Sequence, residues 1–564
     1  MCYRRFPIFK IIFKSIQPQN LYKQPTPDFK MNILMVIPKY NLTNKPNYNY
    51  AFPLGLAYIF TSISNSKHNI ECINLNHLNG STEELLNKAL NKKNYDIVCT
   101  GYMALGYATI EKILNTAKKH SSNPKIILGG SIITSEPKLI FNALKPDYAI
   151  VGEGEITIIE LLDSIENKSN LKNVNGIMFR ENNQIITTKP REIIADLDTI
   201  PFPKLEELGF LEFLENQSND VNFNITDYPR PYAMLCSRGC PYQCTFCYHS
   251  LGFKYRERSI KNIIDELRIA IKKYNINSLS IFDDLFSINK ERVYDFCKSI
   301  MELNKETSRE IDWSCQLSVN NVDKELLETI KQAGCKVVSF GFESYSQKVL
   351  NSMKKPITPE QIDKAIKLTR EVGLGIQGAF IFGDTAETKE TAKETLDFWK
   401  KNCEGQIRLF FIQPYPGSEI YKRCIERGII KDKLDFIKNK ISHTNWINMT
   451  DTMTDQEISD LKKEILEARR KYYPYVIPSK IKNTKTDKYE LEIKCPFCNE
   501  KVNYKNCSIT NRLYFNRLVA CKNCYMRISI VNLPYKLTMD YYNQLEFLRR
   551  NYLSIRDNFL KKKI

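Results

Sequence analysis

Two stretches of this sequence alternate short apolar runs with segments of helical periodicity, and that alternation restricts the fold more than any other feature. Strands that are apolar along their length and separated by helices form parallel sheets covered on both faces. The first stretch therefore predicts a doubly wound, flavodoxin-like α/β domain over residues 31–190. Its apolar runs are 32–38, 70–76, 96–103, 125–130 and 148–155.

The segments that flank this domain have other patterns. Residues 172–190 predict a small hairpin with the polar residues 181–184 at its turn, and residues 191–228 predict a proline-marked linker. Residues 1–30 predict a poorly packed extension, without the clean apolar region and cleavage site of a signal peptide. Because no run of about 18 apolar residues is present either, we expect no membrane span. We expect a cytoplasmic protein, where thiols stay reduced for metal ligation.

The second alternating stretch contains six strand–helix units within residues 229–450. Six units fit an open (β/α)6 partial TIM barrel better than a closed barrel of eight. The functional groups of such a barrel gather at the C-terminal ends of its strands. The predicted strands are 232–237, 278–284, 312–318, 337–344, 375–383 and 407–415.

The remaining region, residues 451–564, predicts helical segments around a cysteine-rich module at residues 495–524. An apolar stripe along the last helix favours a docking face over a membrane anchor. The residues of this stripe are Leu545, Leu548, Tyr552, Ile555 and Phe559.

Three cysteines follow the first predicted barrel strand in CSRGCPYQCTFCYHS, where Cys240, Cys244 and Cys247 have C-x3-C-x2-C spacing. Iron–sulfur clusters are held by cysteine thiolates, and close spacing on one loop lets several thiolates reach the same cluster. Three such ligands would leave one iron of a four-iron cluster open. The alternatives are chance clustering and a zinc knuckle, which needs a fourth ligand. Cys236 could be that ligand, but it lies within the predicted strand.

With this triad beside a barrel strand, the sequence resembles the radical SAM superfamily. The resemblance implies a [4Fe–4S] cluster whose open iron binds S-adenosyl-L-methionine (SAM), and reductive cleavage of SAM to a carbon radical. It also implies an electron donor such as flavodoxin or ferredoxin. Phe246 stands where the family has an aromatic residue before the third cysteine, and Asp283 and Asp284 stand where it binds the SAM amino group. Glu343 would face the ribose or methionine end of SAM.

The resemblance continues beyond these residues, with two departures. GAFIFGDTAET (378–388) is similar to the segment that packs against the adenine, and YPGSEIY (415–421) is similar to the exit of the sixth strand. Gly383 is followed by Asp-Thr where relatives more often have Leu-Pro, and Ser318 stands where many have arginine. These departures leave the cysteine triad intact.

Glycines end three of the first domain's predicted units, in PLGLAYI (53–59), LGGS (128–131) and VGEGE (151–155). Such glycines let a backbone approach a large ligand closely, and the helix N-termini that follow favour polar or anionic groups. In this order and before this barrel, the segments resemble the cobalamin-binding domain of one large radical SAM subclass. The resemblance implies that cobalamin is held by Gly55, Gly129, Gly130, Gly152, Glu153 and Gly154.

His77 is the candidate for a cobalt ligand in this domain. Domains that ligate cobalt use D-x-H-x-x-G after the first strand, whereas His77-Leu-Asn-Gly80 follows the second strand with Leu75 in the Asp position. We therefore interpret His77 as a loop histidine without a cobalt bond.

A third group of cysteines forms two C-x2-C pairs, CPFC (495–498) and CKNC (521–524). This arrangement is typical of a zinc ribbon, in which Cys495, Cys498, Cys521 and Cys524 would form a closed, structural S4 site. The alternative is an accessory iron–sulfur cluster. Cys507 lies between the pairs as a spare thiol.

The sequence as a whole predicts an enzyme that uses SAM and cobalamin for methylation, or for radical rearrangement or cyclisation, of a small-molecule substrate. A SAM-only radical enzyme and a cobalamin sensor with a degenerate barrel are alternatives. A further alternative is a protein that binds or modifies RNA, because the net charge is +18 and both ends of the chain are basic. The intact triad argues against the sensor, and the ribbon lacks interleaved aromatic and basic residues that would favour RNA.

Overall fold

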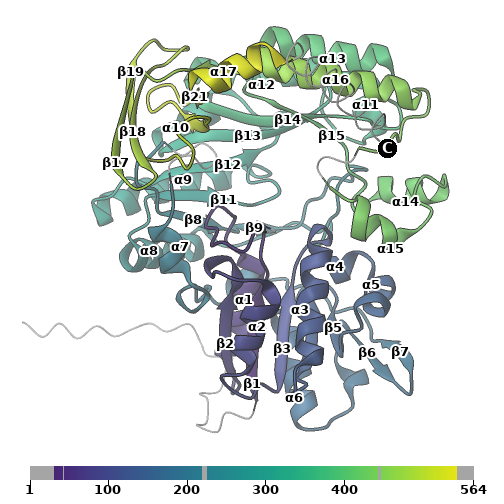
Figure 1. Ribbon diagram of the computed structural model, residues 1–564. Helices are drawn as coiled ribbons and strands as arrows, with labels where there is room; N and C mark the ends of the chain where they lie inside the picture. Colours follow the sequence, from purple (N-terminus) through teal and green to yellow (C-terminus); the bar gives the residue numbers. More distant parts are fainter. Residues whose placement is uncertain (1–30, 42, 219–224, 443–445, 543–564) are drawn as a thin grey trace, which may run out of the picture.

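The computed structural model describes residues 31–41, 43–218, 225–442 and 446–542 (Figure 1). The predicted extension at residues 1–30 and the apolar stripe of the predicted last helix lie outside these residues. In Figure 1 the first domain is at the bottom, the partial barrel lies above it, and the cysteine-rich module is at the upper left. Among the described helices, none is both long and apolar enough to cross a membrane.

The first domain is a seven-stranded sheet in the order β2-β1-β3-β4-β5-β6-β7. Its first five strands are parallel, as the doubly wound prediction requires. They are β1 (Asn32–Ile37), β2 (Asn69–Asn74), β3 (Ile97–Gly101), β4 (Lys125–Gly129) and β5 (Tyr148–Ile150). The helices are α1 (Leu54–Ser64), α2 (Thr82–Leu90), α3 (Tyr107–Lys119), α4 (Ser131–Ser135), α5 (Pro137–Leu144) and α6 (Glu155–Glu166).

The predicted hairpin forms strands β6 (Ile177–Glu181) and β7 (Gln184–Thr187). It extends the main sheet, because β6 pairs antiparallel with β5. Asn182 and Asn183 at the turn have φ of 50° and 64°, the left-handed conformation that two-residue hairpin turns need and asparagine tolerates.

The linker after this hairpin is packed between the two domains. Its helix α7 (Phe210–Glu215) places the Phe213 ring 5.3 Å from that of Phe52 in the first domain. Phe210 packs 6.0 Å from Tyr232 on the first barrel strand. One hydrophobic cluster therefore continues from the first domain through the linker into the barrel.

The barrel is an open sheet of six parallel strands in the order β15-β14-β13-β12-β11-β8, so the (β/α)6 prediction is confirmed. The strands are β8 (Pro231–Met234), β11 (Ser278–Ile281), β12 (Asp312–Leu317), β13 (Cys335–Glu343), β14 (Gly375–Phe382) and β15 (Arg408–Phe411). The helices around the sheet include α8 (Ile260–Tyr274), α9 (Lys290–Thr307), α10 (Lys324–Gln332), α11 (Gln347–Ser352), α12 (Pro359–Val372), α13 (Lys389–Asn402) and α14 (Glu419–Glu426).

The first barrel strand is shorter than the predicted 232–237. After β8 the chain forms β9 (Ser237–Arg238), which pairs antiparallel with β10 (Arg256–Glu257). Residues 239–255, the cluster loop, leave the sheet and return through this two-residue ladder. Figure 1 shows β9 between the first domain and the barrel sheet.

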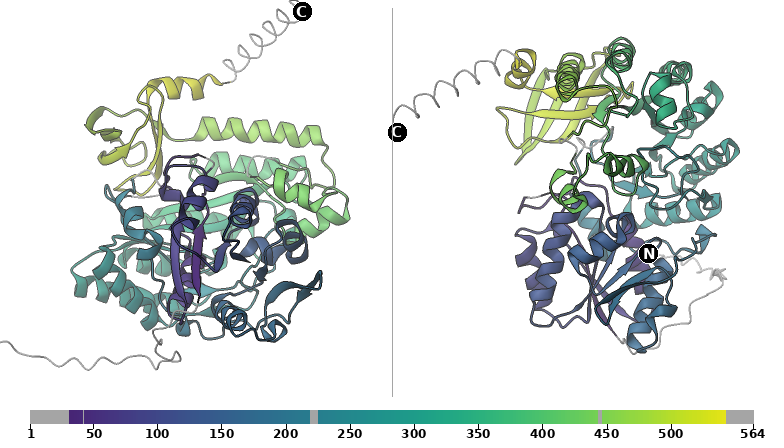
Figure 2. Two further views of the ribbon diagram at one scale, coloured as in Figure 1. Left: turned by 60° about the horizontal axis from the view of Figure 1, so that its bottom comes forward. Right: turned by 90° about the vertical axis from the view of Figure 1, so that its right-hand side faces the viewer.

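The C-terminal region follows α15 (Lys433–Asp435), a π-helical turn (Phe436–Lys440) and α16 (Asp455–Tyr472). It contains two three-stranded sheets and α17 (Leu533–Asp540). The sheets consist of β16 (Tyr475–Val476), β20 (Asn516–Ala520) and β21 (Arg527–Val531), and of β17 (Lys480–Lys485), β18 (Lys488–Lys494) and β19 (Lys501–Ser508). The two views in Figure 2 place this module against the barrel and away from most of the first domain.

Candidate active site

The cluster loop is held in place by backbone hydrogen bonds to two distant segments. The Thr245 amide donates to the Met353 carbonyl at 3.0 Å, and the Thr245 carbonyl accepts from the Ile420 amide at 2.9 Å. Gly239 has φ of +81°, and a Cβ there would lie 2.4 Å from the Lys254 carbonyl oxygen. Glycine is therefore required where the loop leaves β9.

The three thiols of this loop differ in exposure: Cys244 is buried, Cys240 is half-buried and Cys247 is exposed. Among the described residues, sets of ligand atoms that all lie within 4.8 Å of one another occur elsewhere and do not include this triad. The three thiols of the triad therefore do not surround a single ion in this structure. Burial raises the pKa of the Cys244 thiol to about 11, so a thiolate there needs a nearby positive charge.

A cavity of about 560 Å³, the upper cavity, lies at the C-terminal ends of the barrel strands. The sequence-predicted site residues of the barrel all line it, although they come from the cluster loop, the exit of β11 and the end of β13. These residues are Cys240, Cys244, Phe246, Cys247, Asp283, Asp284 and Glu343.

Glu343 lies at an irregularity in the pairing of β13 with β14, and its φ of +62° is uncommon for a residue with a side chain. Its carboxylate lies 3.0 Å from the Lys355 ammonium, which also lines the upper cavity. Burial lowers the pKa of Lys355, but the Glu343 and Cys244 charges outweigh burial and raise it to about 12. Lys355 therefore provides a fixed positive charge beside the thiols.

The two neighbouring aspartates have different surroundings. Asp283 is buried and accepts hydrogen bonds from the Cys236 amide at 2.6 Å and the Ser237 hydroxyl at 2.7 Å. Burial raises its pKa to about 6. Asp283 thus fixes the segment that leads into the cluster loop, whereas Asp284 is exposed on the wall of the upper cavity.

The glycines of the first domain lie at the C-terminal edge of its sheet, but only some of them face open space. A Cβ at Gly55, Gly129 or Gly152 would meet no atom within 4 Å. A Cβ at Gly130, whose φ is +85°, would lie 2.9 Å from the Tyr102 carbonyl oxygen, and one at Gly154 would lie 2.8 Å from Ile59. The first three glycines leave the open surface that a bulky cofactor needs. At the other two positions glycine is needed because a side chain would clash with a neighbouring residue.

Glu153, between two of these glycines, joins the first domain to the cluster loop. Its carboxylate accepts from Arg238 on β9 at 3.0 Å and from Arg256 on β10 at 2.9 Å. All three side chains are buried, and Glu153 also accepts from the Ile194 amide at 2.7 Å. The structure therefore places Glu153 in an ion-pair cluster between the domains, where sequence reasoning expected a cofactor contact.

His77 lies in the connection between β2 and α2, in agreement with its predicted place in a loop. It ends a short 3₁₀ helix (Leu75–His77) and is buried. Its Nε2 lies 2.7 Å from the Tyr50 hydroxyl, and its Nδ1 lies 3.3 Å from a Glu212 carboxylate oxygen. Both ring nitrogens therefore face protein partners.

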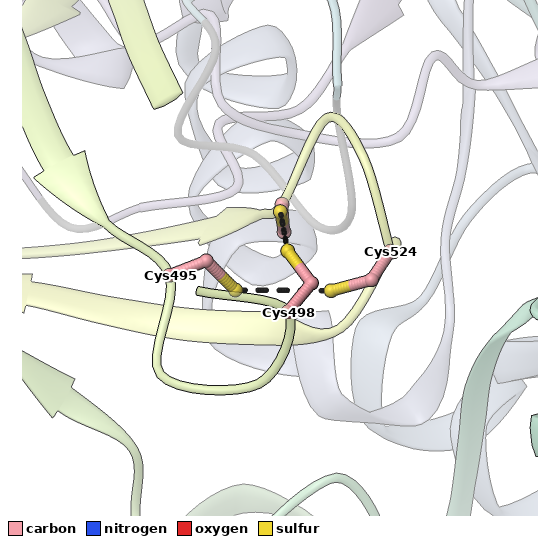
Figure 3. Close-up of side chains that lie close together, drawn as sticks. Cys495, Cys498 and Cys524 are labelled. Carbon is pink, nitrogen blue, oxygen red and sulfur yellow. Dashed lines mark hydrogen bonds between the residues drawn. The ribbon is translucent and has the colours of Figure 1, made fainter. Parts of the chain in front are cut away.

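The four ribbon cysteines converge from two turns, one after β18 and one after β20 (Figure 3). The Sγ atoms of Cys495 and Cys524 lie 3.7 Å apart, and those of Cys498 and Cys521 lie 3.8 Å apart. Four sulfurs at about 2.3 Å from one tetrahedral Zn²⁺ would be about 3.8 Å apart. The donor set and its spacing therefore fit a single zinc ion. Cys507 is buried on β19, outside this group.

Sequence reasoning missed two groups of this site. Lys355 ends the segment GFESYSQKVLNSMKK (341–355), which contains Glu343, and a lysine 12 residues after that glutamate was the available signal. Arg238 and Arg256 bracket the triad in sequence, but nothing local indicates that their carboxylate partner comes from the first domain.

Two family models match the chain at the two domains described above. The radical SAM superfamily model matches residues 234–398, and the B12-binding domain model matches residues 47–162. The chain is 31% identical over 412 residues to an uncharacterized methyltransferase of Pyrococcus horikoshii, covering 71% of this chain and 84% of that protein.

Two further similarities concern proteins with stated activities. The chain is 26% identical over 391 residues to an anaerobic magnesium-protoporphyrin IX monomethyl ester cyclase of Rubrivivax gelatinosus, covering 68% of this chain and 67% of that protein. Its fold is similar to the structure of the radical SAM methyltransferase TsrM from Kitasatospora setae with cobalamin and a [4Fe–4S] cluster bound. That similarity has a TM-score of 0.56 and 16% identity, and covers 70% of this chain and 75% of TsrM.

Proposed function

Since this chain belongs to the radical SAM superfamily and carries the B12-binding domain of its cobalamin-dependent members, we propose that Cys240, Cys244 and Cys247 hold the [4Fe–4S] cluster that cleaves SAM. When bound, the cluster and cobalamin supply reductive SAM cleavage and methyl-group or radical chemistry. The observation that carries the assignment is the meeting of all predicted barrel residues around the upper cavity.

The chain's own groups would hold SAM in the upper cavity by charge and shape. Asp284 offers an exposed carboxylate for the SAM amino group, and Phe246 adds an aromatic wall. Lys355 lowers the pKa of the nearby thiols, whereas the carboxylate of its partner Glu343 raises the pKa of Cys244 and Cys247, so the thiolate forms depend on the cluster that they would bind. Asp283 acts indirectly, because its hydrogen bonds fix the start of the cluster loop.

We place cobalamin at the open glycine edge of the first domain, against Gly55, Gly129 and Gly152. Glu153, at this edge, forms ion pairs with Arg238 and Arg256 at the two ends of the cluster loop. These contacts support a cobalamin site next to the upper cavity. Because both nitrogens of His77 have protein partners, we propose that His77 would not bind the cobalt of cobalamin.

The reaction proposed is methylation of a small-molecule substrate, with radical rearrangement or cyclisation as the alternative outcome of the same site. The methyltransferase and cyclase relatives support this pair of outcomes. We further propose a structural zinc ion at the four ribbon cysteines, and reduction of the cluster by a flavodoxin or ferredoxin.

The triad assignment is tested by changing Cys240, Cys244 and Cys247 together to Ala in the full chain, reconstituted without oxygen. The variant should lose the iron absorbance and form no 5′-deoxyadenosine from SAM. Cys236→Ala is the matched control, because this buried cysteine precedes the loop and its amide, not its thiol, bonds Asp283. If the triple variant still holds a cluster and cleaves SAM, the assignment of the triad is wrong. If Cys236→Ala loses the cluster, Cys236 is indicated as a fourth ligand.

A further inference from the structure

A buried histidine of the first domain has neither ring nitrogen hydrogen-bonded. His68 lies in the connection between α1 and β2, and only 2% of its surface is exposed. Within the part of the chain that the structure describes, Nδ1 and Nε2 both have no hydrogen-bond partner. Such burial is unfavourable for a polar group. Burial also lowers the pKa of the imidazole, so the ring is neutral and one nitrogen offers a lone pair to a ligand.

Two carboxylates face this ring. Asp163 and Glu166 are three residues apart in the last turn of α6, so they share one face of the helix. Nε2 of His68 lies 3.6 Å from an Asp163 carboxylate oxygen. One ligand atom from each of the three residues lies within 4.8 Å of the other two. Donor atoms at about 2.1 Å from one cation lie up to about 4.2 Å apart, so small side-chain movements bring all three to a single ion.

The carboxylates also stand where an α-helix disfavours negative charge. The C-terminal turn of a helix carries partial negative charge and favours cations. The helices α2 and α3 have lysines in their last turns, whereas α6 has no basic residue there. The cation at the end of α6 comes from another segment, because the Lys67 ammonium lies 2.8 Å from Asp163 and 2.8 Å from Glu166. This group of side chains is therefore built around a positive charge.

Lys67 does not close the group to other cations. Its side chain is 28% exposed, and it precedes His68 in the connection after α1, so the ammonium has a route into solvent. A lysine ammonium contacts carboxylates but cannot accept the lone pair of a neutral imidazole as a metal ion does. A divalent cation at this position would bond all three residues, whereas the ammonium pairs with the two carboxylates.

The group lies far from the cofactor sites. The helix α6 begins next to Gly154 at the glycine edge of the first domain, so its last turn lies at the opposite edge of the sheet (Figure 1). His68 directly precedes β2 at that same edge. A cation held there would join the end of α6 to the start of β2 without touching SAM or cobalamin.

We propose that His68, Asp163 and Glu166 bind a divalent cation of the Mn²⁺ or Fe²⁺ type, which displaces the Lys67 ammonium from between the carboxylates. One imidazole and two carboxylates suit such cations, while the four thiolates of the ribbon suit zinc. Because the cation joins two elements of the first domain, its binding adds to the stability of the folded state. The site is independent of the proposed function.

The test is a titration of the full chain, with zinc bound to the ribbon, with Mn²⁺, whose free form is measured by electron paramagnetic resonance. His68→Gln should bind Mn²⁺ at least about tenfold more weakly than wild type, because even loss of a residue behind a metal ligand weakens binding 10–100-fold. The double variant Asp163→Asn/Glu166→Gln leaves the buried histidine in place and should lose the same binding. Mn²⁺ should raise the thermal unfolding midpoint of wild type but not that of the double variant.

The lysine variants test the competition. Lys67→Gln should bind Mn²⁺ more tightly than wild type, because the competing ammonium is gone. Lys463→Gln is the matched control, since Lys463 is an exposed lysine on α16 that pairs with Asp460 at 2.7 Å, and it should leave Mn²⁺ binding unchanged. Absence of saturable Mn²⁺ binding by wild type and by Lys67→Gln would overturn the proposal. Equal Mn²⁺ affinity of wild type and the Asp163→Asn/Glu166→Gln variant would also overturn it, because the ion would then bind elsewhere.

Discussion

Replacing Glu153 by Gln would leave two guanidinium groups without their shared carboxylate at the boundary between the domains. Arg238 and Arg256 are 6% and 5% exposed, and Glu153 is 8% exposed. Water therefore cannot solvate the two guanidinium groups in place of the lost carboxylate. Removal of one member of such a buried ion-pair cluster typically costs roughly 3–5 kcal/mol of folding free energy. The remaining contacts reduce this penalty. Arg238 keeps Glu155 at 2.6 Å, and Arg256 keeps the Ile194 carbonyl at 2.7 Å.

We therefore expect Glu153→Gln to lower the free energy of unfolding by about 3 kcal/mol, the lower end of that range. The measurement is urea denaturation of the metal-loaded chain, followed by circular dichroism. Glu160→Gln is the matched control, because Glu160 pairs with Arg191 on the surface and its side chain is 45% exposed. Exposed pairs contribute about 1 kcal/mol or less, so the control should change little. Equal losses in the two variants would refute the claim that the Glu153 cluster joins the domains.

Three further predictions concern the cofactor, the metal and pH. Gly129→Trp, which fills open space without backbone strain, should abolish cobalamin binding measured by absorbance after desalting while iron content stays unchanged; full cobalamin retention would move the site elsewhere. Cys495→Ser/Cys521→Ser should lower zinc from about one ion per chain to near none by elemental analysis, whereas Cys507→Ser should keep it, and iron in place of zinc would indicate an accessory cluster. Because burial raises the pKa of Asp283 from 3.8 to about 6, the folded protein holds the extra proton in that range, and the unfolding free energy should fall as pH rises from 3.8 to about 6. Asp283→Asn should reduce the slope of unfolding free energy against pH in this range. An unchanged slope would contradict the raised pKa of Asp283.

The strands of both sheets could be predicted because their burial follows the local sequence. Every residue of β3 is buried, so its apolar run is continuous. On β12 buried and partly exposed residues instead alternate, and the polar positions Ser314 and Gln316 line the upper cavity. The sequence shows that alternation but not the hollow that it faces, because the hollow depends on how six strands curve together.

The candidate site was predictable where its residues share a loop or a strand end. The cysteine triad belongs to this class, and so does each C-x2-C pair of the ribbon, since the spacing brings the thiols of one turn near one another. The two pairs meet through the fold of the module. The roles of adjacent glycines were not predictable: Gly129 faces open space while Gly130 has φ of +85° and abuts Tyr102. Only the backbone conformation separates them.

Contacts between distant segments account for the other differences. Glu153 pairs with Arg238 and Arg256, which lie 85 and 103 residues further along the chain. His77 is buried because the linker places Glu212 and Gly209 against its ring. A pattern within one segment contains no information about such partners, so these contacts of Glu153 and His77 could not be predicted.

Whether the chain cleaves SAM with a cluster and cobalamin is decided by product analysis with mass spectrometry, after anaerobic reconstitution with iron, sulfide, cobalamin and SAM under reducing conditions. We expect 5′-deoxyadenosine from radical cleavage whenever the cluster is intact, and bound cobalamin that remains with the protein after desalting. S-adenosylhomocysteine would appear in addition if the reaction is methylation. A protein that holds its cluster and SAM but forms no 5′-deoxyadenosine, or that takes up no cobalamin, would not be a cobalamin-dependent radical SAM enzyme.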